Sequence, residues 1–235
     1  MLSRIFNLIF FLLLSTSTSG QCHEGLTKQQ QWDNSATEVD TWVDGLGRSL
    51  DEGIKETVIV LNLLGFTTRQ SCEGHLNWGV ANPWIDFTLN RPEVVALDNQ
   101  RSEFFEAELK EQLLALRIKY PDLSMDETFH TPEGELLKRP YSKFLYLFSL
   151  YNEEAKKDLM PLFDLLDEFY KIHASSGDQK LCIEISGSIR LESFGGYLQD
   201  QRPGHEREAN LGLYREEMEA FTSFLKDRFF STIES

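Results

Sequence analysis

The sequence predicts an α+β fold, in which a mostly antiparallel sheet is covered by helices. Apolar residues recur at spacings of three and four in several long segments, which is typical of amphipathic helices. Between these segments, short stretches alternate apolar and polar residues, as half-buried strands do. The segments run helix, strand, strand three times, so we expect the order α-β-β three times and then a closing C-terminal helix.

The first and second repeats are predicted from periodicity and from the residues that end helices. Residues 46–61 form the first helical stripe, Gly65 ends it, and strands follow at 66–71 and 84–89. Residues 105–120 form the second helix, which stops before Pro121. In the second repeat we expect a strand and turn within 125–138 and a strand buried on both faces at 144–151.

The third repeat contains the most specific prediction of register. A helix is expected from Asn152 to about residue 170, and strands at 181–186 and 188–194. Both strands put apolar residues on one face only if an odd, three-residue turn joins them at 186–188. That turn places Glu184 opposite Arg190 and Cys182 opposite Glu192. A polar loop at 195–208 and a closing helix at 211–229 complete the chain.

Composition narrows the classes of function. The 235 residues are 41% hydrophobic, which is enough for a core, and 38 acidic against 23 basic residues give a net charge of −15. Because phosphate binding depends on Lys and Arg, nucleic acid is not the partner we expect. The three cysteines do not make a disulfide framework. The expected partner is a small molecule, and cofactor and oligomeric state are left open.

Residues 1–20 have the order of a secretory signal peptide. Arg4 precedes an apolar run at 5–14, and small polar residues follow at 15–20. The apolar run is too short to span a bilayer, so no transmembrane anchor is expected after cleavage. The protein is then exported; the alternative is a cytoplasmic protein whose start codon is assigned too early. Residues 21–45 lack periodicity and are expected to form a loosely packed arm, and residues 46–235 one α+β domain.

The densest group of chemically versatile residues is Ser71-Cys-Glu-Gly-His75, which leaves a predicted strand. Cys72, Glu73 and His75 are candidate catalytic residues, because they supply a nucleophile, a carboxylate and a base. The expected ligand-binding set is Ser71, Cys72, Glu73, His75, Trp78, Arg190 and Glu192. We therefore predict a soluble protein with a small-ligand or substrate site around residues 71–75.

Four interpretations of this loop remain open. Cys72 could be a thiolate nucleophile assisted by His75. Cys72 and His75 could be half of a metal site completed by His130, Cys182, His205 or a carboxylate. The loop could bind a ligand without covalent or metal chemistry. Finally, it could be a structural turn of a non-catalytic acidic scaffold or interaction protein.

The same residues carry a resemblance. Residues 63–75, followed by Pro83-Trp-Ile-Asp-Phe87, resemble a Ser-Cys-x-Gly-His motif of bacterial and phage proteins whose function is not established. More distantly, the segment is similar to the Thr-x-Ser-Ser-Cys-Ser-Gly-Arg motif of wybutosine-synthesising tRNA methyltransferases. Thr68, Ser71, Cys72 and Gly74 match, whereas His75 stands in place of the arginine. The acidic charge and the leader argue against a tRNA enzyme, so methyl transfer is not inferred.

The leader gives a testable prediction. If residues 1–20 are removed on export, the intact mass of the protein isolated from its own cell will correspond to a chain that begins near Gln21. A full-length chain in the cytosol would contradict the prediction.

Overall fold

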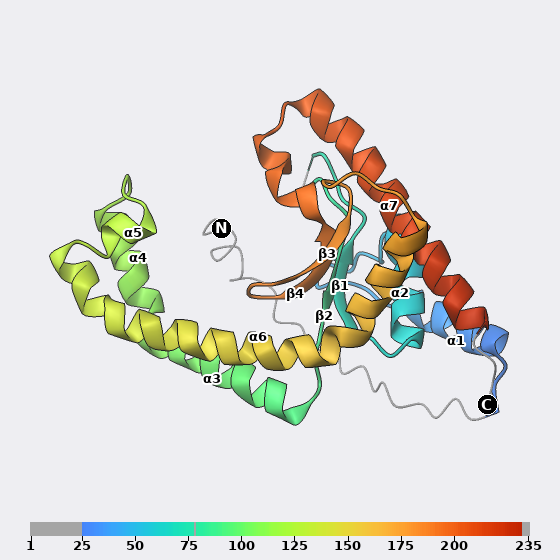
Figure 1. The fold of residues 1–235 in the computed structure, drawn as a ribbon, viewed down its shortest axis with the longest axis horizontal. Coiled ribbons are helices and arrows are strands. Elements are labelled where there is room, and N and C mark those ends of the chain that lie inside the picture. Colours follow the sequence, from blue (N-terminus) through green and yellow to red (C-terminus); the bar gives the residue numbers. More distant parts are fainter. Residues whose placement is uncertain (1–24, 78, 232–235) are drawn as a thin grey trace. The chain divides into compact units, whose positions relative to one another are not determined.

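The computed structural model describes residues 25–77 and 79–231, and it separates into two compact units (Figure 1). The first unit contains the described residues up to Thr88 together with those from Leu162 onward, and the second contains Leu89–Pro161. Each unit is described by itself. No helix among the described residues is long and apolar enough to cross a membrane.

The first unit is built around a four-stranded antiparallel sheet. Its strands are β1 (Thr68–Cys72), β2 (Trp84–Phe87), β3 (Leu181–Ile185) and β4 (Ile189–Ser193), in the order β1-β2-β4-β3. The helical elements of this unit are α1 (Lys28–Val39), α2 (Glu52–Leu63), η3 (Phe194–Gln201), α7 (Gly204–Ser231) and the end of α6 (Pro132–Ile172). The α+β class, with helices packed on an antiparallel sheet, is confirmed.

The predicted β3–β4 register is also confirmed. Glu184 pairs with Arg190 and Cys182 with Glu192. The N–H of Ser186 donates to the carbonyl of Ser188 at 3.2 Å, closing the three-residue turn. The alternation of apolar residues in both strands fixed this register, since a shift of one residue would turn every apolar side chain to the other face.

One face of the sheet carries the apolar core of the first unit. Ile85 and Leu191 are fully buried on this face, and α2, α7 and the end of α6 contribute most of the other buried apolar side chains of the unit. Figure 1 shows both helices on the same side of the strands. Between them, the hydroxyls of Thr57 and Thr222 share a hydrogen bond of 2.7 Å. The buried pair satisfies two polar groups that would otherwise be costly in an apolar layer.

The opposite face of the sheet is polar but largely buried. Antiparallel pairing aligns Cys72, Trp84, Glu192 and Cys182 in one row across the four strands. In the next row on this face, two residues further along each strand, Arg190 donates to both carboxylate oxygens of Asp86, at 2.6 and 3.0 Å. The same guanidinium lies 3.9 Å from the centre of the Trp84 ring. The charge of Arg190 is therefore offset by Asp86 and covered by an aromatic ring.

The segment before α2 is more regular than its sequence predicts. Although it lacks hydrophobic periodicity, it contains α1, which begins with a capping box between Thr27 and Gln30. Val39 is buried, and the ring of Trp32 lies 5.7 Å from that of Phe230 on α7. Local capping and a few contacts with α7 stabilise this helix, so hydrophobic periodicity alone did not reveal it. Helix α2 begins at Glu52, six residues later than expected.

The second unit is helical in the described residues. It contains α3 (Pro92–Glu108), α4 (Lys110–Lys119), α5 (Met125–Thr128) and the part of α6 up to Pro161. The strands expected at 125–138 and 144–151 are therefore wrong, and Asn152 lies inside a helix rather than at its start. The error has a physical cause: within the run 144–151, Leu147 is buried whereas Leu145 and Tyr146 are exposed, a helical pattern hidden by apolar residues on both sides.

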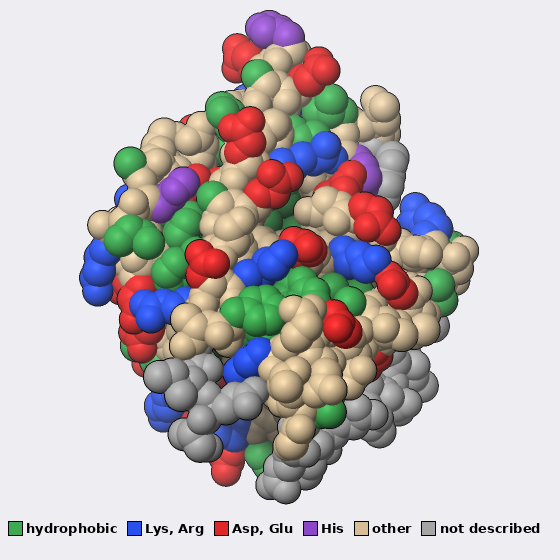
Figure 2. Space-filling view, turned by 90° about the vertical axis from the view of Figure 1, so that its right-hand side faces the viewer, with side chains coloured by type: hydrophobic (Ala, Val, Ile, Leu, Met, Phe, Trp, Pro, Cys, Tyr) green, Lys and Arg blue, Asp and Glu red, His purple; other side chains and the backbone are tan. Residues whose placement is uncertain are grey.

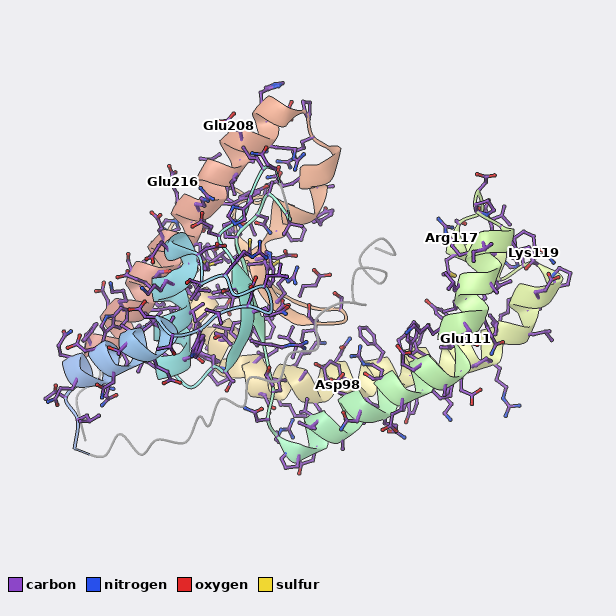
Figure 3. The ribbon with its side chains drawn as sticks, turned by 180° about the vertical axis from the view of Figure 1, so that it is seen from behind. Asp98, Glu111, Arg117, Lys119, Glu208 and Glu216 are labelled. Atoms are coloured by element: carbon purple, nitrogen blue, oxygen red, sulfur yellow. The ribbon has the colours of Figure 1, made fainter. Side chains whose placement is uncertain are left out.

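Polar contacts define the ends and faces of these helices. A capping box between Ser124 and Glu127 begins α5. Lys119 and Tyr120 both form hydrogen bonds with the Glu133 carboxylate. These contacts lower the pKa of the Glu133 carboxyl to about 2, and the bond from Lys119 has the larger effect. Figure 3 shows Arg117 and Lys119 on α4. In the first unit, Glu208 and Glu216 on α7 are exposed (Figure 3). On the face drawn in Figure 2, acidic and basic side chains are interspersed.

The polar face of the sheet gives a prediction about stability. Asp86 and Arg190 have side chains only 8% and 20% exposed, so Asp86→Ala leaves a mostly buried guanidinium without its carboxylate. We expect the free energy of unfolding to fall by about 2–4 kcal/mol, measured by urea denaturation. The control is Arg48→Ala, which removes an exposed pair with Asp44 and should leave the urea midpoint unchanged. An unchanged midpoint in Asp86→Ala would show that this pair contributes nothing to the fold.

Candidate metal centre

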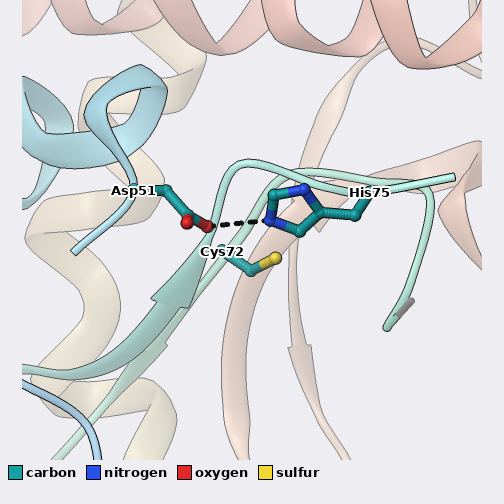
Figure 4. Close-up of side chains that lie close together, drawn as sticks. All are labelled: Asp51, Cys72 and His75. Carbon is teal, nitrogen blue, oxygen red and sulfur yellow. Dashed lines mark hydrogen bonds and ion pairs between the residues drawn. The ribbon is translucent and has the colours of Figure 1, made fainter. Parts of the chain in front are cut away.

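Asp51, Cys72 and His75 lie together at one end of the sheet (Figure 4). Asp51 immediately precedes α2, Cys72 is the last residue of β1, and His75 follows three residues later. One ligand atom from each side chain lies within 4.8 Å of the other two. His75 Nε2 and Asp51 Oδ2 are 3.1 Å apart. A carboxylate, a thiol and an imidazole thus meet from segments that are more than 20 residues apart in sequence.

The loop that carries Cys72 and His75 depends on a glycine. Gly74 has a φ of +83°, which is strained for residues with a side chain. A Cβ on Gly74 would also lie 2.7 Å from Leu211 Cδ1 and under 3 Å from the backbone of Asn82. Beyond Gly74, the N–H of His75 donates to the carbonyl of Val80 at 3.0 Å. The tight turn therefore requires Gly74 both for its backbone conformation and for its lack of volume.

Glu73, rather than the N-cap residue Asp51, provides the side-chain hydrogen bond that caps α2. Asp51 is the N-cap residue of α2, yet its side chain makes no capping hydrogen bond to its own helix. Glu73 Oε2 instead accepts from the N–H of Gly53 in the first turn, at 2.9 Å. Asp51 Oδ2 in return accepts from the N–H of Glu73 at 3.2 Å. The exchange leaves the Asp51 carboxylate directed at the Cys72–His75 loop while the helix start stays capped.

Arg215 on α7 fastens the same loop from the other side. Its Nε donates to the Glu73 carbonyl at 3.0 Å, and its Nη2 donates to the Gly74 carbonyl at 2.6 Å and to Glu73 Oε1 at 3.1 Å. Both carboxylate oxygens of Glu73 are therefore engaged, one by Arg215 and one by Gly53. In this arrangement Glu73 positions the loop rather than acting as a free carboxylate.

The environment of Cys72 keeps its sulfur protonated. Burial raises the pKa of the Cys72 thiol to about 11, and the negative charge of Asp51 acts in the same direction. The Gly74 N–H, which lies 3.3 Å from the sulfur, opposes this effect without overcoming it. His75 Nε2 contacts the Asp51 carboxylate at 3.1 Å. At neutral pH the thiol is thus a poor nucleophile until another positive charge favours the thiolate.

The structure brings together only part of the expected site. Ser71 is paired with Ile85, so its side chain lies on the apolar face, opposite that of Cys72. Trp78 lies outside the described residues. Glu192 is on the same face as Cys72, two strands away, and accepts from Asn82 Nδ2 at 3.1 Å. Arg190 is also on this face, bound to Asp86.

Asp51 is the residue that sequence analysis missed. Of the groups considered as a third ligand (His130, Cys182, His205 or a carboxylate), it is a carboxylate, Asp51, that lies beside Cys72 and His75 in the described part of the chain. The available signal was an acidic residue at the start of a helix, a position usually explained by capping alone. The contacts of Asp51 with Glu73 and His75, together with the pairing of Glu73 with Gly53, show that its carboxylate does not cap α2.

Comparison with known proteins gives no independent guide to this site. No protein-family model matches the chain, and searches of curated proteins and of solved structures find no match either.

The buried thiol predicts a pH-dependent reactivity. With Cys22 and Cys182 replaced by serine and any metal removed by chelator, we expect folded protein to resist iodoacetamide at pH 7.5. The alkylation rate, followed by mass spectrometry, should then rise toward pH 11, because the thiolate forms only as pH approaches the raised pKa of Cys72. Denatured protein is the control and should react readily at pH 8.5. Rapid alkylation of the folded protein at pH 7.5 would contradict a protonated thiol.

Proposed function

We propose that Asp51, Cys72 and His75 bind one divalent metal ion, with Zn²⁺ as the best fit, and that this ion is the centre of a small-ligand or substrate site. The observation that carries the proposal is the convergence of the three ligand atoms within 4.8 Å. Bond lengths of about 2.0–2.3 Å put the ligand atoms of a tetrahedral zinc site roughly 3.3–3.8 Å apart. Side-chain movements of about 1 Å would close the site around an ion.

The types of ligand favour zinc over harder ions. A thiolate and an imidazole select borderline metals such as Zn²⁺, whereas Mg²⁺ and Ca²⁺ prefer oxygen ligands throughout. The thiolate and the Asp51 carboxylate would together balance the two positive charges of the ion. The metal also supplies the positive charge that Cys72 needs to ionise, so binding releases a proton.

The surroundings of the three side chains resemble the outer shell of a metal site. The N–H groups of Glu73 and Gly74 point at Asp51 Oδ2 and at the Cys72 sulfur, at 3.2 and 3.3 Å. Backbone donors in these places orient metal ligands and stabilise their negative charge. Glu73 and Arg215 in turn hold the loop that carries these donors.

Three protein ligands leave one position of a tetrahedral ion open. Structural zinc sites are usually closed by four protein ligands, whereas catalytic sites keep a position for water or substrate. Within the described residues, the group of possible ligands contains three members. We therefore favour a site at which the ion binds a ligand directly, over a purely structural turn in a scaffold protein.

The proposal predicts metal content and metal-dependent stability. After zinc loading and dialysis, the wild-type protein should retain one Zn²⁺ per chain, measured by elemental analysis together with native mass spectrometry. Asp51→Asn, Cys72→Ser and His75→Ala should each lose most of it. Chelator should lower the melting temperature of the wild type, because a metal at 100 times its dissociation constant stabilises by about 2.7 kcal/mol. The three variants should no longer respond to chelator.

Two variants are matched controls for this experiment. Cys182→Ser removes another cysteine that forms no disulfide, and His173→Ala removes another histidine that contacts a carboxylate, Glu217, at 3.1 Å. Both should keep one Zn²⁺ per chain. Circular dichroism checks that every variant is folded. A wild-type protein that is folded, holds no zinc after loading and melts at the same temperature with chelator would overturn the proposal.

A further inference from the structure

Two buried polar atoms next to the candidate metal centre have no hydrogen-bond partner among the described residues. They are Asn82 Oδ1, an acceptor, and Trp84 Nε1, a donor. Asn82 is only 1% exposed. Leaving such atoms unpaired in the interior costs about 1–3 kcal/mol each, so buried polar groups are normally satisfied. Together they offer one hydrogen-bond acceptor and one donor to a ligand.

The positions of both residues are fixed relative to Cys72. Trp84 is the direct cross-strand neighbour of Cys72, and both side chains lie on the polar face of the sheet. Asn82 Nδ2 donates to Glu192 Oε2 at 3.1 Å, which holds the amide over the same face. Gly74 and Gly196 both pack against Asn82, so closely that a Cβ on Gly196 would lie 2.1 Å from Nδ2. The amide therefore has little freedom to turn toward another partner.

The chemistry of the two atoms identifies the class of ligand. A free acceptor and a free donor match a group that presents an N–H and a C=O side by side, as a carboxamide does. An anionic ligand fits less well, because Arg190 is already bound by Asp86 through two hydrogen bonds. Arg190 also lies over the Trp84 ring, at 3.9 Å from its centre, so that ring face is not free for a stacked ligand.

We infer that Asn82 and Trp84 bind the amide edge of the ligand of the metal centre, with Asn82 Oδ1 accepting its N–H and Trp84 Nε1 donating to its C=O. This inference rests on the proposed function. Cys72 would bind the metal, and its cross-strand neighbour Trp84 would bind the amide beside it. It places recognition of an amide group on β2 and on the residues just before it. The amide N–H and C=O could belong to a small primary amide or to a peptide.

Two hydroxamates test the inference in the cobalt-loaded protein. Acetohydroxamate and N-methylacetohydroxamate both chelate a metal, but only the first retains an N–H. Binding is followed by the visible absorption of Co²⁺. We expect the wild type to bind acetohydroxamate about tenfold more tightly, the effect of one hydrogen bond to a buried acceptor. Asn82→Leu, of similar size, should lose this preference, whereas a purely steric effect of the methyl group would persist.

A second variant and a control complete the test. Trp84→Phe should weaken the binding of both hydroxamates by a similar factor, because each loses the N–H that donates to its C=O. This variant also tests the inference if Asn82→Leu does not fold. Asn152→Leu is the matched control, since Asn152 Oδ1 is also buried without a partner but lies on α6 in the second unit. It should keep the tenfold preference. If N-acetylglycine hydroxamate binds more tightly than acetohydroxamate, the amide belongs to a peptide. If the two bind equally, the amide belongs to a small molecule.

The outcomes separate this inference from the proposed function. If both hydroxamates change the cobalt spectrum with equal affinity in the wild type, the metal centre stands and amide recognition is wrong. Unchanged affinities in Trp84→Phe would overturn the role of Trp84. If the protein binds no cobalt at all, the proposed function itself fails, and the inference fails with it.

Discussion

The candidate site depends on the exchange of hydrogen bonds between Asp51 and Glu73. A helix start must have its free N–H groups satisfied, and an aspartate at the N-cap would ordinarily use its own carboxylate. Here Glu73 accepts from Gly53 instead, so Asp51 is available to the Cys72–His75 loop. The N–H of Gly53 at the start of α2 is thereby satisfied by a residue from a distant segment, and the half-buried Asp51 carboxylate is left to face the loop.

The rest of the first unit supports this exchange. The apolar face of the sheet packs on α2 and α7, and this packing brings the start of α2 and the side chain of Arg215 to the same loop. The polar face lies on the other side, with Asp86 and Arg190 neutralising each other next to Trp84. One sheet therefore provides stability through one face and a chemically varied, largely buried surface through the other.

Features that depend on residues close together in the sequence could be predicted, whereas features that depend on distant contacts could not. The β3–β4 register was predictable because strict alternation allowed one odd turn. The run at 144–151 was misread as a strand because a wholly apolar stretch has no period that separates strand from helix. Cys72 and His75 were found because they are close in sequence. Asp51 was not, because its role depends on contacts 22 and 24 residues away.

The clamp by Arg215 has a consequence for the order of events during synthesis. Arg215 follows Glu73 by 142 residues, and the whole second unit is translated between them. The nascent Cys72–His75 loop can meet Asp51 early, but its carbonyl groups lack their arginine partner until α7 has left the ribosome. An incomplete chain would thus hold a looser form of the site, and the tight geometry would be acquired only with the last helix.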